Sequence, residues 1–292
     1  MRDVPQVRPA SRRSLSWVGL APFFAFALLF LILPISFLVI GSFQNNQGQV
    51  TIQNYRDLST PLIVTAFRNS IEISLVTAVG GGIFGFLLAY AVILGGLPRF
   101  LRTGLMTFSG VASNFAGVPL ALAFTFTLSQ AGLVTVLLKQ LFGLNIYQSG
   151  FTLFGRLGIE LVYMYFQFPL MVLIIAPAID GLRKDWREAA ENMGASSGQY
   201  WRMVALPILF PSLLGTVILL FGNAFGAQAT AFQLTGGTLA LVPVVIGAQI
   251  SGDVLHNPGL GYALAIGMVV IMAISIAVYT LLQRRSERWL RS

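Results

Sequence analysis

The sequence predicts an all-α integral membrane protein with six membrane-spanning helices. Three observations support this fold class. Hydrophobic residues make up 56% of the 292 residues and charged residues only 10%, whereas soluble domains carry roughly 25% charged residues. Six apolar segments each approach the roughly 20 residues that a helix needs to cross a bilayer. The basic residues gather in short clusters on one side of these segments.

The six predicted spans follow one another along the chain. They lie near Trp17–Phe43, Ile71–Leu94, Leu105–Leu128, Ile159–Ile179, Ile208–Ala231 and Leu260–Leu282. The first predicted span follows a basic segment, which is also the arrangement of the apolar core in a signal peptide. Its apolar run is far longer than the roughly 7–15 residues of such a core, so we interpret it as a retained span.

Arginine and lysine are distributed unevenly between the two sides of the membrane. Six spans place both termini on one side, and that side holds fourteen of the eighteen basic residues. The other side holds Arg56, Arg68, Lys139 and Arg156. The positive-inside rule therefore predicts that both termini are cytoplasmic. The same clustering explains the net charge of +8 without a nucleic-acid partner.

Two of the predicted external segments contain apolar stretches of their own. Ser129–Arg156 is half apolar, which predicts a helix at the membrane surface. Thr235–Gly259 contains the apolar stretch Leu239–Ile250, which is too short to span. We expect a re-entrant or interfacial element there.

The composition excludes several kinds of chemistry. The chain has no cysteine and a single histidine, His256, so thiolate catalysis and a histidine-based metal cluster are excluded. Neither Lys139 nor Lys184 follows a glycine, so the sequence has no P-loop for ATP. No nucleophile–base set is evident. We expect no catalytic site, metal or cofactor in this chain, and any ATP hydrolysis must occur in a partner protein.

The cytoplasmic segment 181–207 predicts two short amphipathic helices. Asp185 suits the N-cap of the first helix, with Glu188 as its capping-box partner. One face of this helix carries Trp186, Ala189, Ala190 and Met193. Gly194 suits the left-handed position that ends a helix.

The second short helix of this segment is expected to begin at Ser196 or Ser197 as its cap. It carries Tyr200 and Trp201, and Pro207 is expected to start span five. Three aromatic residues in a short cytoplasmic segment indicate a surface for a partner protein.

The same segment resembles the EAA loop of permease subunits of binding-protein-dependent ABC importers. The matching residues, at the family's spacing, are Glu188, Ala189, Ala190, Gly194, Val204, Leu206 and Pro207. Val204 stands where the family usually has isoleucine. Asn69-Ser70 and Ala89-Tyr90-Ala91 also resemble the family, and the resemblance runs from Phe67 to Leu282. The N-terminal span is similar to the extra first helix of the polyamine-type branch.

The resemblance implies the type I ABC importer permease fold, in the inner membrane of a bacterium. It implies a core at 67–283, preceded by an N-terminal span and external loop within 1–66 and followed by a basic tail at 284–292. Implied partners are an ABC ATPase dimer, a solute-binding protein and a second permease subunit, for which the resemblance favours an unlike chain, with an identical chain as the alternative. The residues implied in coupling to the ATPase are Asp185, Glu188, Ala189, Ala190, Gly194, Leu206 and Pro207.

Polar residues within the spans are candidates for contact with a solute, because such residues are costly in lipid and often functional. The candidates are Asn114, Gln167, Asn223 and Gln228. Gly117 and Pro169 predict kinks in spans three and four that are able to line a cavity. The alternative role is structural, because Asn and Gln also hydrogen-bond between helices for about 0.6–2 kcal/mol each.

Other functions compete with that of an importer subunit. A secondary transporter driven by an ion gradient usually needs a charged relay at mid-membrane, and no predicted span centre carries an acidic or basic residue. The EAA-like segment argues against a purely structural subunit. The sequence does not name the solute, although the resemblance favours a polyamine or a related small organic or ionic compound.

Overall fold

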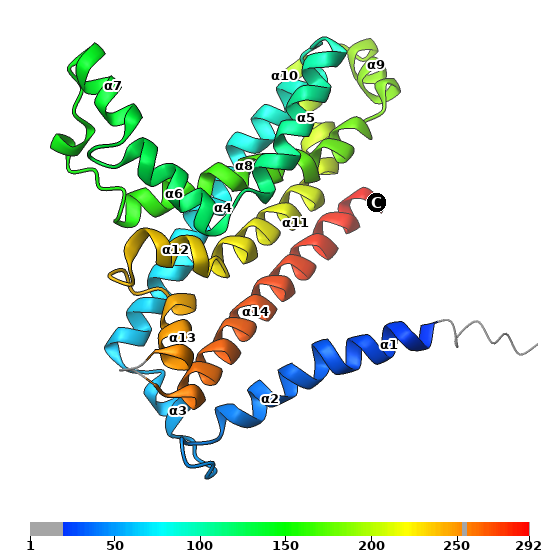
Figure 1. The fold of residues 1–292 in the computed structure, drawn as a ribbon. Helices are drawn as coiled ribbons and strands as arrows, with labels where there is room; N and C mark the ends of the chain where they lie inside the picture. The colour runs from blue at the N-terminus through cyan, green and yellow to red at the C-terminus, as the bar shows by residue number, and fades with distance from the viewer. Residues whose placement is uncertain (1–19, 253–255, 292) are drawn as a thin grey trace, which may run out of the picture.

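The computed structural model describes residues 20–252 and 256–291, and these residues are almost entirely helical (Figure 1). A single isolated bridge, Gln44 to Val50, is the only β pairing among them. The N-terminal cytoplasmic segment expected before the first span, and the start of that span near Trp17, lie outside the described residues.

The helices follow the chain in this order: α1 Ala21–Ala27, η2 Leu28–Ile32, α2 Leu33–Ser42, α3 Gln53–Asp57, α4 Pro61–Leu94, α5 Arg99–Asn114, α6 Gly117–Leu128, α7 Leu133–Phe142, η3 Ile146–Ser149, α8 Arg156–Asp180, α9 Lys184–Asn192, α10 Ser197–Tyr200, η4 Trp201–Ala205, α11 Leu206–Phe225, α12 Gln228–Thr235, α13 Val242–Ser251 and α14 Pro258–Arg291. Six segments of the described residues are long and apolar enough to cross a membrane, which confirms the predicted number.

The third apolar segment differs from the prediction. The sequence placed it near Leu105–Leu128, but the helix breaks at Phe115 and Ala116, and the segment with span-like hydropathy is Gly117–Phe142, formed by α6 and α7. The break has a local cause, because Ala116 is extended and Gly117 has a φ of +74°. α5 is amphipathic rather than uniformly apolar, and its first turns carry two arginines.

Two expected boundaries fall inside single helices. α4 begins at Pro61, which is pre-organised for the first turn of a helix, so the boundary at 66/67 lies within its second turn. α14 continues to Arg291, so the basic tail at 284–292 is largely an extension of the last helix. Short helices also form in the two external segments: α7 lies within Ser129–Arg156, where it continues the third apolar segment, and α13 lies within Thr235–Gly259.

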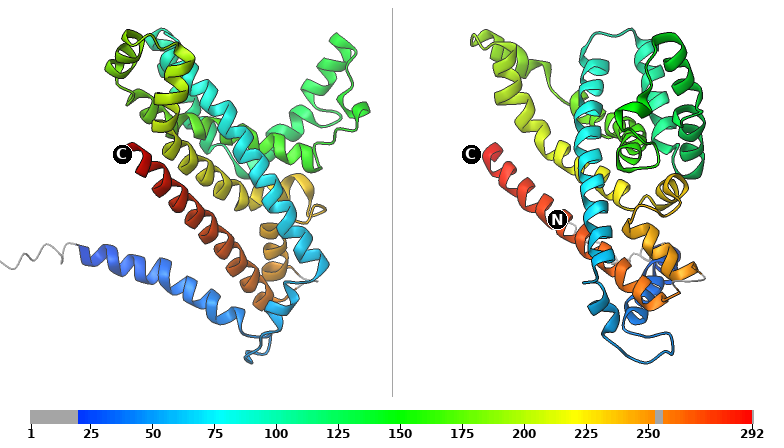
Figure 2. Two further views of the ribbon diagram at one scale, coloured as in Figure 1. Left: turned by 180° about the vertical axis from the view of Figure 1, so that it is seen from behind. Right: turned by 90° about the vertical axis from the view of Figure 1, so that its left-hand side faces the viewer.

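The central packing is between α4 and α8, which lie side by side in both views of Figure 2. Glycines on α4 permit this close approach. A Cβ atom added at Gly81 would lie 2.8 Å from Cβ of Gln167, and one added at Gly85 would lie 2.5 Å from Cβ of Met171. Small residues four positions apart allow the backbones of membrane helices to approach closely, where dispersion forces act over many atoms.

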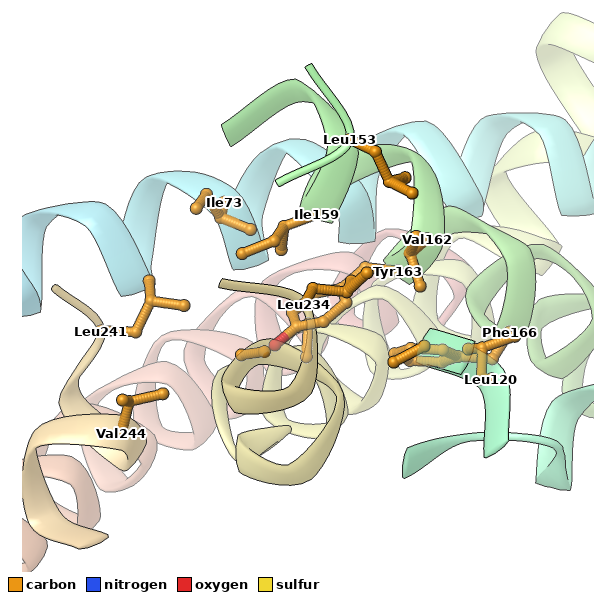
Figure 3. Close-up of a cluster of buried hydrophobic side chains, with 13 residues drawn as sticks. Ile73, Leu120, Leu153, Ile159, Val162, Tyr163, Phe166, Leu234, Leu241 and Val244 are labelled. Atoms are coloured by element: carbon orange, nitrogen blue, oxygen red, sulfur yellow. The ribbon is translucent and has the colours of Figure 1, made fainter. Parts of the chain in front are cut away.

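A buried cluster joins the broken helices to this central pair (Figure 3). Ile73 comes from α4, Leu120 from α6, Phe166 from α8, Leu234 from α12 and Val244 from α13. The helix breaks therefore lie around a common apolar core rather than in separate loops.

The first span diverges from the rest of the chain. Figures 1 and 2 show α2 meeting α14 toward the C-terminal end of α2, whereas α1 lies apart from α14. At the contact, a Cβ atom added at Gly41 would lie 2.5 Å from the Tyr262 ring. The buried Asn54 amide donates to the carbonyl oxygens of Ser42 and Gln44, at 2.9 Å each. Most of the other apolar side chains of this span are exposed in the isolated chain.

Candidate functional site

The segment between α8 and α11 forms a helical hairpin at one end of the bundle (Figure 1). Ala190, Tyr200 and Ala205 are buried at its centre, and Trp186 and Trp201 pack against them half-buried. We call residues 183–207 the hairpin. Its own small apolar core indicates a folded unit rather than a flexible connection.

The start of the hairpin differs from the prediction. α9 begins at Lys184, Arg183 is its N-cap residue, and no side chain caps it, so the capping box expected from Asp185 and Glu188 is wrong. Asp185 instead lies in the first turn and pairs with Arg183 at 2.6 Å. An acidic side chain there still interacts favourably with the unpaired N–H groups at the helix start.

The turn at Gly194 confirms the predicted end of the first helix. Gly194 has a φ of +82°, which strongly favours glycine. Its N–H donates to the Glu191 carbonyl, and the Ala195 N–H donates to the Ala190 carbonyl, at 2.9 Å each. This pair of bonds is a Schellman motif, and it satisfies two carbonyls at the end of α9.

The start of the second helix resolves the choice between two serines. Ser196 is the N-cap of α10, and it forms a reciprocal capping box with Gln199. The Ser196 N–H donates to Gln199 Oε1 at 2.7 Å, and the Gln199 N–H donates to Ser196 Oγ at 3.3 Å.

The second helix does not end before span five. α10, the π-helical turn η4 and α11 run on as one helical segment from Ser197 to Phe225, so Pro207 lies in the first turn of α11 as expected but follows a helical turn instead of a loop. Proline removes an N–H group and crowds the preceding turn. In the turn before it, the Leu206 N–H bonds back to the Trp201 carbonyl, five residues earlier. Such a π-turn relieves the crowding and re-orients the side chains of 201–205.

The aromatic residues of the hairpin pack within the chain, contrary to the expectation that they form its partner surface. Tyr200 is buried, and the Trp201 ring meets that of Tyr90, near the end of α4, at 4.9 Å between centroids. The most exposed large apolar side chains of the hairpin are instead Met193 and Met203, at 81% and 70% of full exposure. No local pattern in the sequence indicates that Met203 is exposed, because its orientation depends on the π-turn.

The helix face predicted for α9 is divided between core and solvent. Trp186 and Ala190 face the core, whereas Ala189 and Met193 are exposed. Glu188 is also exposed, and it forms no hydrogen bond or ion pair with the part of the chain that the structure describes. A free carboxylate beside a small residue and a flexible methionine is a surface able to receive another protein closely.

The four polar candidates in the spans fall into two groups. Asn114, Asn223 and Gln228 are exposed in the isolated chain. Gln167 is completely buried, and its Nε2 donates to Thr77 Oγ1 at 2.7 Å. Its Oε1 has no hydrogen-bond partner among the described residues. Gln167 therefore joins α8 to α4, which favours the structural alternative for this residue.

Hydrogen bonds to backbone atoms join the broken helices near the exposed candidates. The Gly117 N–H at the start of α6 donates to Thr230 Oγ1 of α12 at 2.9 Å. The Tyr163 hydroxyl of α8 donates to the Ala227 carbonyl, just before α12, at 2.7 Å. These bonds hold the break that follows Asn114 against the start of α12, where Gln228 lies.

The fold and the hairpin together define a multi-pass membrane protein with a folded helical unit at one end of its bundle. The chain matches, over residues 81–291, the family of binding-protein-dependent transport system inner membrane components, and it belongs to this family. It is thus a multi-pass inner-membrane transport component rather than an enzyme.

The curated relatives that the chain matches are named as transport system permease proteins. The chain is 30% identical over 247 residues to a probable sulfate transport system permease protein of Chlorella vulgaris, covering 82% of this chain and 84% of the relative. It is 25% identical to a spermidine/putrescine transport system permease protein of Haemophilus influenzae, covering 92% and 96%. A trehalose transport system permease protein of Mycobacterium tuberculosis is 28% identical, covering 81% and 78%.

Solved structures support the fold. A chain of a bacterial ABC transporter involved in the import of alginate, an acidic polysaccharide, matches with a TM-score of 0.72 at 18% identity, covering 93% of this chain and 95% of that chain. The MetNI methionine ABC transporter matches with a TM-score of 0.54 at 15% identity, covering 78% and 99%. The fold is therefore that of ABC importer permeases.

Proposed function

We propose that this chain is the permease subunit of an ATP-driven importer, with both termini in the cytoplasm. A solute-binding protein delivers the solute, a second permease subunit completes the path, and a separate ABC ATPase dimer supplies the energy. The chain itself requires no bound cofactor. Family membership supports the transport role, and the fourteen-to-four division of basic residues supports the orientation.

We propose that the ATPase docks on residues 185–207 of the hairpin, and the structure of the hairpin supports this. Its core is satisfied within the chain, yet Glu188, Ala189, Met193 and Met203 remain exposed on its surface. Leu206 and Pro207 continue directly into α11, so a force on the hairpin reaches that span without a flexible joint. Gly194 and the buried Ala190 fix the angle between the two short helices.

The solute path is proposed to involve Asn114, Asn223 and Gln228, which are exposed and lie at or near the helix breaks. Gln167 has a different role, because it is enclosed between α4 and α8.

The solute is proposed to be a polyamine or a related small organic or ionic compound. The similarity to the spermidine/putrescine permease over 92% of the chain supports this, and a sulfate permease matches over the same share. Other relatives are named as permeases of sulfate and trehalose systems, so sulfate and trehalose are the alternative solutes to be tested. Binding of labelled spermidine, sulfate and trehalose to the purified partner solute-binding protein separates the three.

The coupling role is tested with the whole transporter in proteoliposomes. Glu188→Gln removes the free carboxylate, and we expect solute-stimulated ATP hydrolysis to fall about tenfold, because the interface with the ATPase no longer has a charged group at this position. Glu191→Gln is the matched control, because that exposed carboxylate already pairs with Arg187 at 2.9 Å. Equal effects of the two variants contradict the assignment. Uptake that needs no ATPase and follows a proton or sodium gradient supports the secondary transporter instead.

A further inference from the structure

The Asn69-Ser70 pair of α4 contacts the start of the short helix α13, far away in the sequence. Ser70 Oγ accepts a hydrogen bond from the Val242 N–H at 2.9 Å. Asn69 Nδ2 donates to the Ala240 carbonyl at 3.1 Å. Ser70 and Val242 are both buried, at 4% and 0% exposure, so the bond between them is shielded from water.

Helix α13 needs this contact because its own sequence does not supply a cap. The first N–H groups of a helix have no partner within the helix. The N-cap residue of α13 is Leu241, which has no side-chain acceptor, and Pro243 lacks an N–H group. The Val242 N–H is therefore paired from outside, and Ser70 acts as a cap supplied by another helix.

The position of α13 in turn determines where Gln228 lies. Gly247 of α13 leaves the space that the Gln228 amide occupies, since a Cβ atom added there would overlap Nε2 of Gln228. On the α14 side, a Cβ atom added at Gly261 would lie 2.8 Å from Ile250 of α13. α13 thus has close neighbours on two sides, and Ser70 fixes its start.

The same helix that carries Ser70 also reaches the hairpin. α4 is one continuous helix, and Tyr90, twenty residues after Ser70, stacks edge-to-face on Trp201 of η4. At 1.5 Å per residue, the two contacts are about 30 Å apart along the helix. One rigid element therefore connects the hairpin with α13.

We propose that Asn69 and Ser70 are positioning residues that attach α13 to α4, so that the two helices move together and keep Gln228 in place during transport. The proposal rests on the proposed function for its transport consequence, but the attachment itself is a property of this chain. Neither residue needs to touch the solute.

The attachment is tested by cysteine labelling, which the cysteine-free sequence makes specific. Val244→Cys places a thiol on the buried face of α13, where Val244 is 6% exposed. In the assembled transporter, Ser70→Ala is expected to raise the rate of labelling by a maleimide about tenfold, because a buried N–H loses its acceptor. Ser74→Ala, one turn further along α4 and similarly buried, is the control and should leave the rate unchanged.

Ser70→Thr keeps the hydroxyl and is expected to restore slow labelling, and Asn69→Leu to raise the rate more modestly than Ser70→Ala. Equal labelling in the Ser70→Ala and Ser74→Ala variants overturns the attachment. In the transport assay, Ser70→Ala should retain ATP hydrolysis while severalfold less solute is imported per ATP. If Ser70→Ala imports as much solute per ATP as the unaltered protein, the positioning role is overturned. If the chain has no ATPase partner, the proposed function is overturned, but the labelling rates still test the attachment of α13 to α4.

Discussion

Replacing Gly194 with alanine is expected to strain the hairpin through the backbone alone. At φ = +82°, an L-residue is less stable by roughly 1–2 kcal/mol than in a right-handed conformation. A Cβ atom added at Gly194 meets no atom within 4 Å, so no steric clash contributes. The Schellman bonds from Gly194 and Ala195 are therefore weakened by about that amount, a factor of roughly 5–30 in the equilibrium between closed and open turns.

Hydrogen exchange measures this change directly. The Ala195 amide, which donates to the Ala190 carbonyl at 2.9 Å, should exchange about 5–30 times faster in Gly194→Ala than in the unaltered protein. Solute-stimulated ATP hydrolysis should fall in parallel, because the angle between the two short helices is no longer fixed. Gly194→Asn should be milder, since asparagine tolerates the left-handed region better.

A matched control lies four residues further on. Gly198 of α10 also has no atom within 4 Å of an added Cβ, but its φ is not positive. Gly198→Ala should leave exchange at Ala195 unchanged and stabilise α10 slightly, because alanine favours a helix over glycine. Unchanged exchange in Gly194→Ala, or equal acceleration in both variants, refutes the reasoning.

Three further predictions concern the packing of the spans and the hairpin surface. Thr77→Val removes the hydroxyl that accepts a hydrogen bond from the Gln167 amide, and it should lower the free energy of unfolding in detergent by about 0.5–2 kcal/mol. Gln167→Leu should be tolerated and should retain uptake. Loss of uptake with unchanged stability in Gln167→Leu would return Gln167 to the solute path. Gly85→Ala should lower the thermal unfolding temperature, because a Cβ atom added at Gly85 would lie 2.5 Å from both backbone and side-chain atoms of α8. Gly110→Ala should leave that temperature unchanged, because a Cβ atom added there meets no atom within 4 Å. Equal shifts in the two variants contradict the close packing of α4 against α8. Met203→Glu should weaken co-purification of the ATPase while the permease keeps its unfolding temperature, and undiminished co-purification removes this side chain from the docking surface.

The site was predictable where its signals are local. Gly194 and the serine cap at Ser196 were found because a positive φ and a capping box need particular residues at fixed spacing. Glu188 was found through the family resemblance, although its predicted capping role was wrong. The exposure of Met203 was missed because the π-turn that orients it depends on how Pro207 is accommodated in a continuous helix.

The sequence alone determined the number of spans, and it predicts the orientation of the chain. Each of these follows from the cost of placing polar and charged groups in lipid, which depends on local composition. It also determined that the energy for an ATP-driven step comes from another protein, because the chain has no P-loop.

Only the tertiary structure decided which partner each polar side chain finds. Gln167 lies buried against Thr77, whereas Asn114 and Gln228 are exposed, and composition does not distinguish these amides. Ser70 caps a helix 172 residues away in the sequence. A hydrogen bond depends on distances of a few tenths of an ångström between segments that are remote along the chain, and those distances are set only when the helices pack.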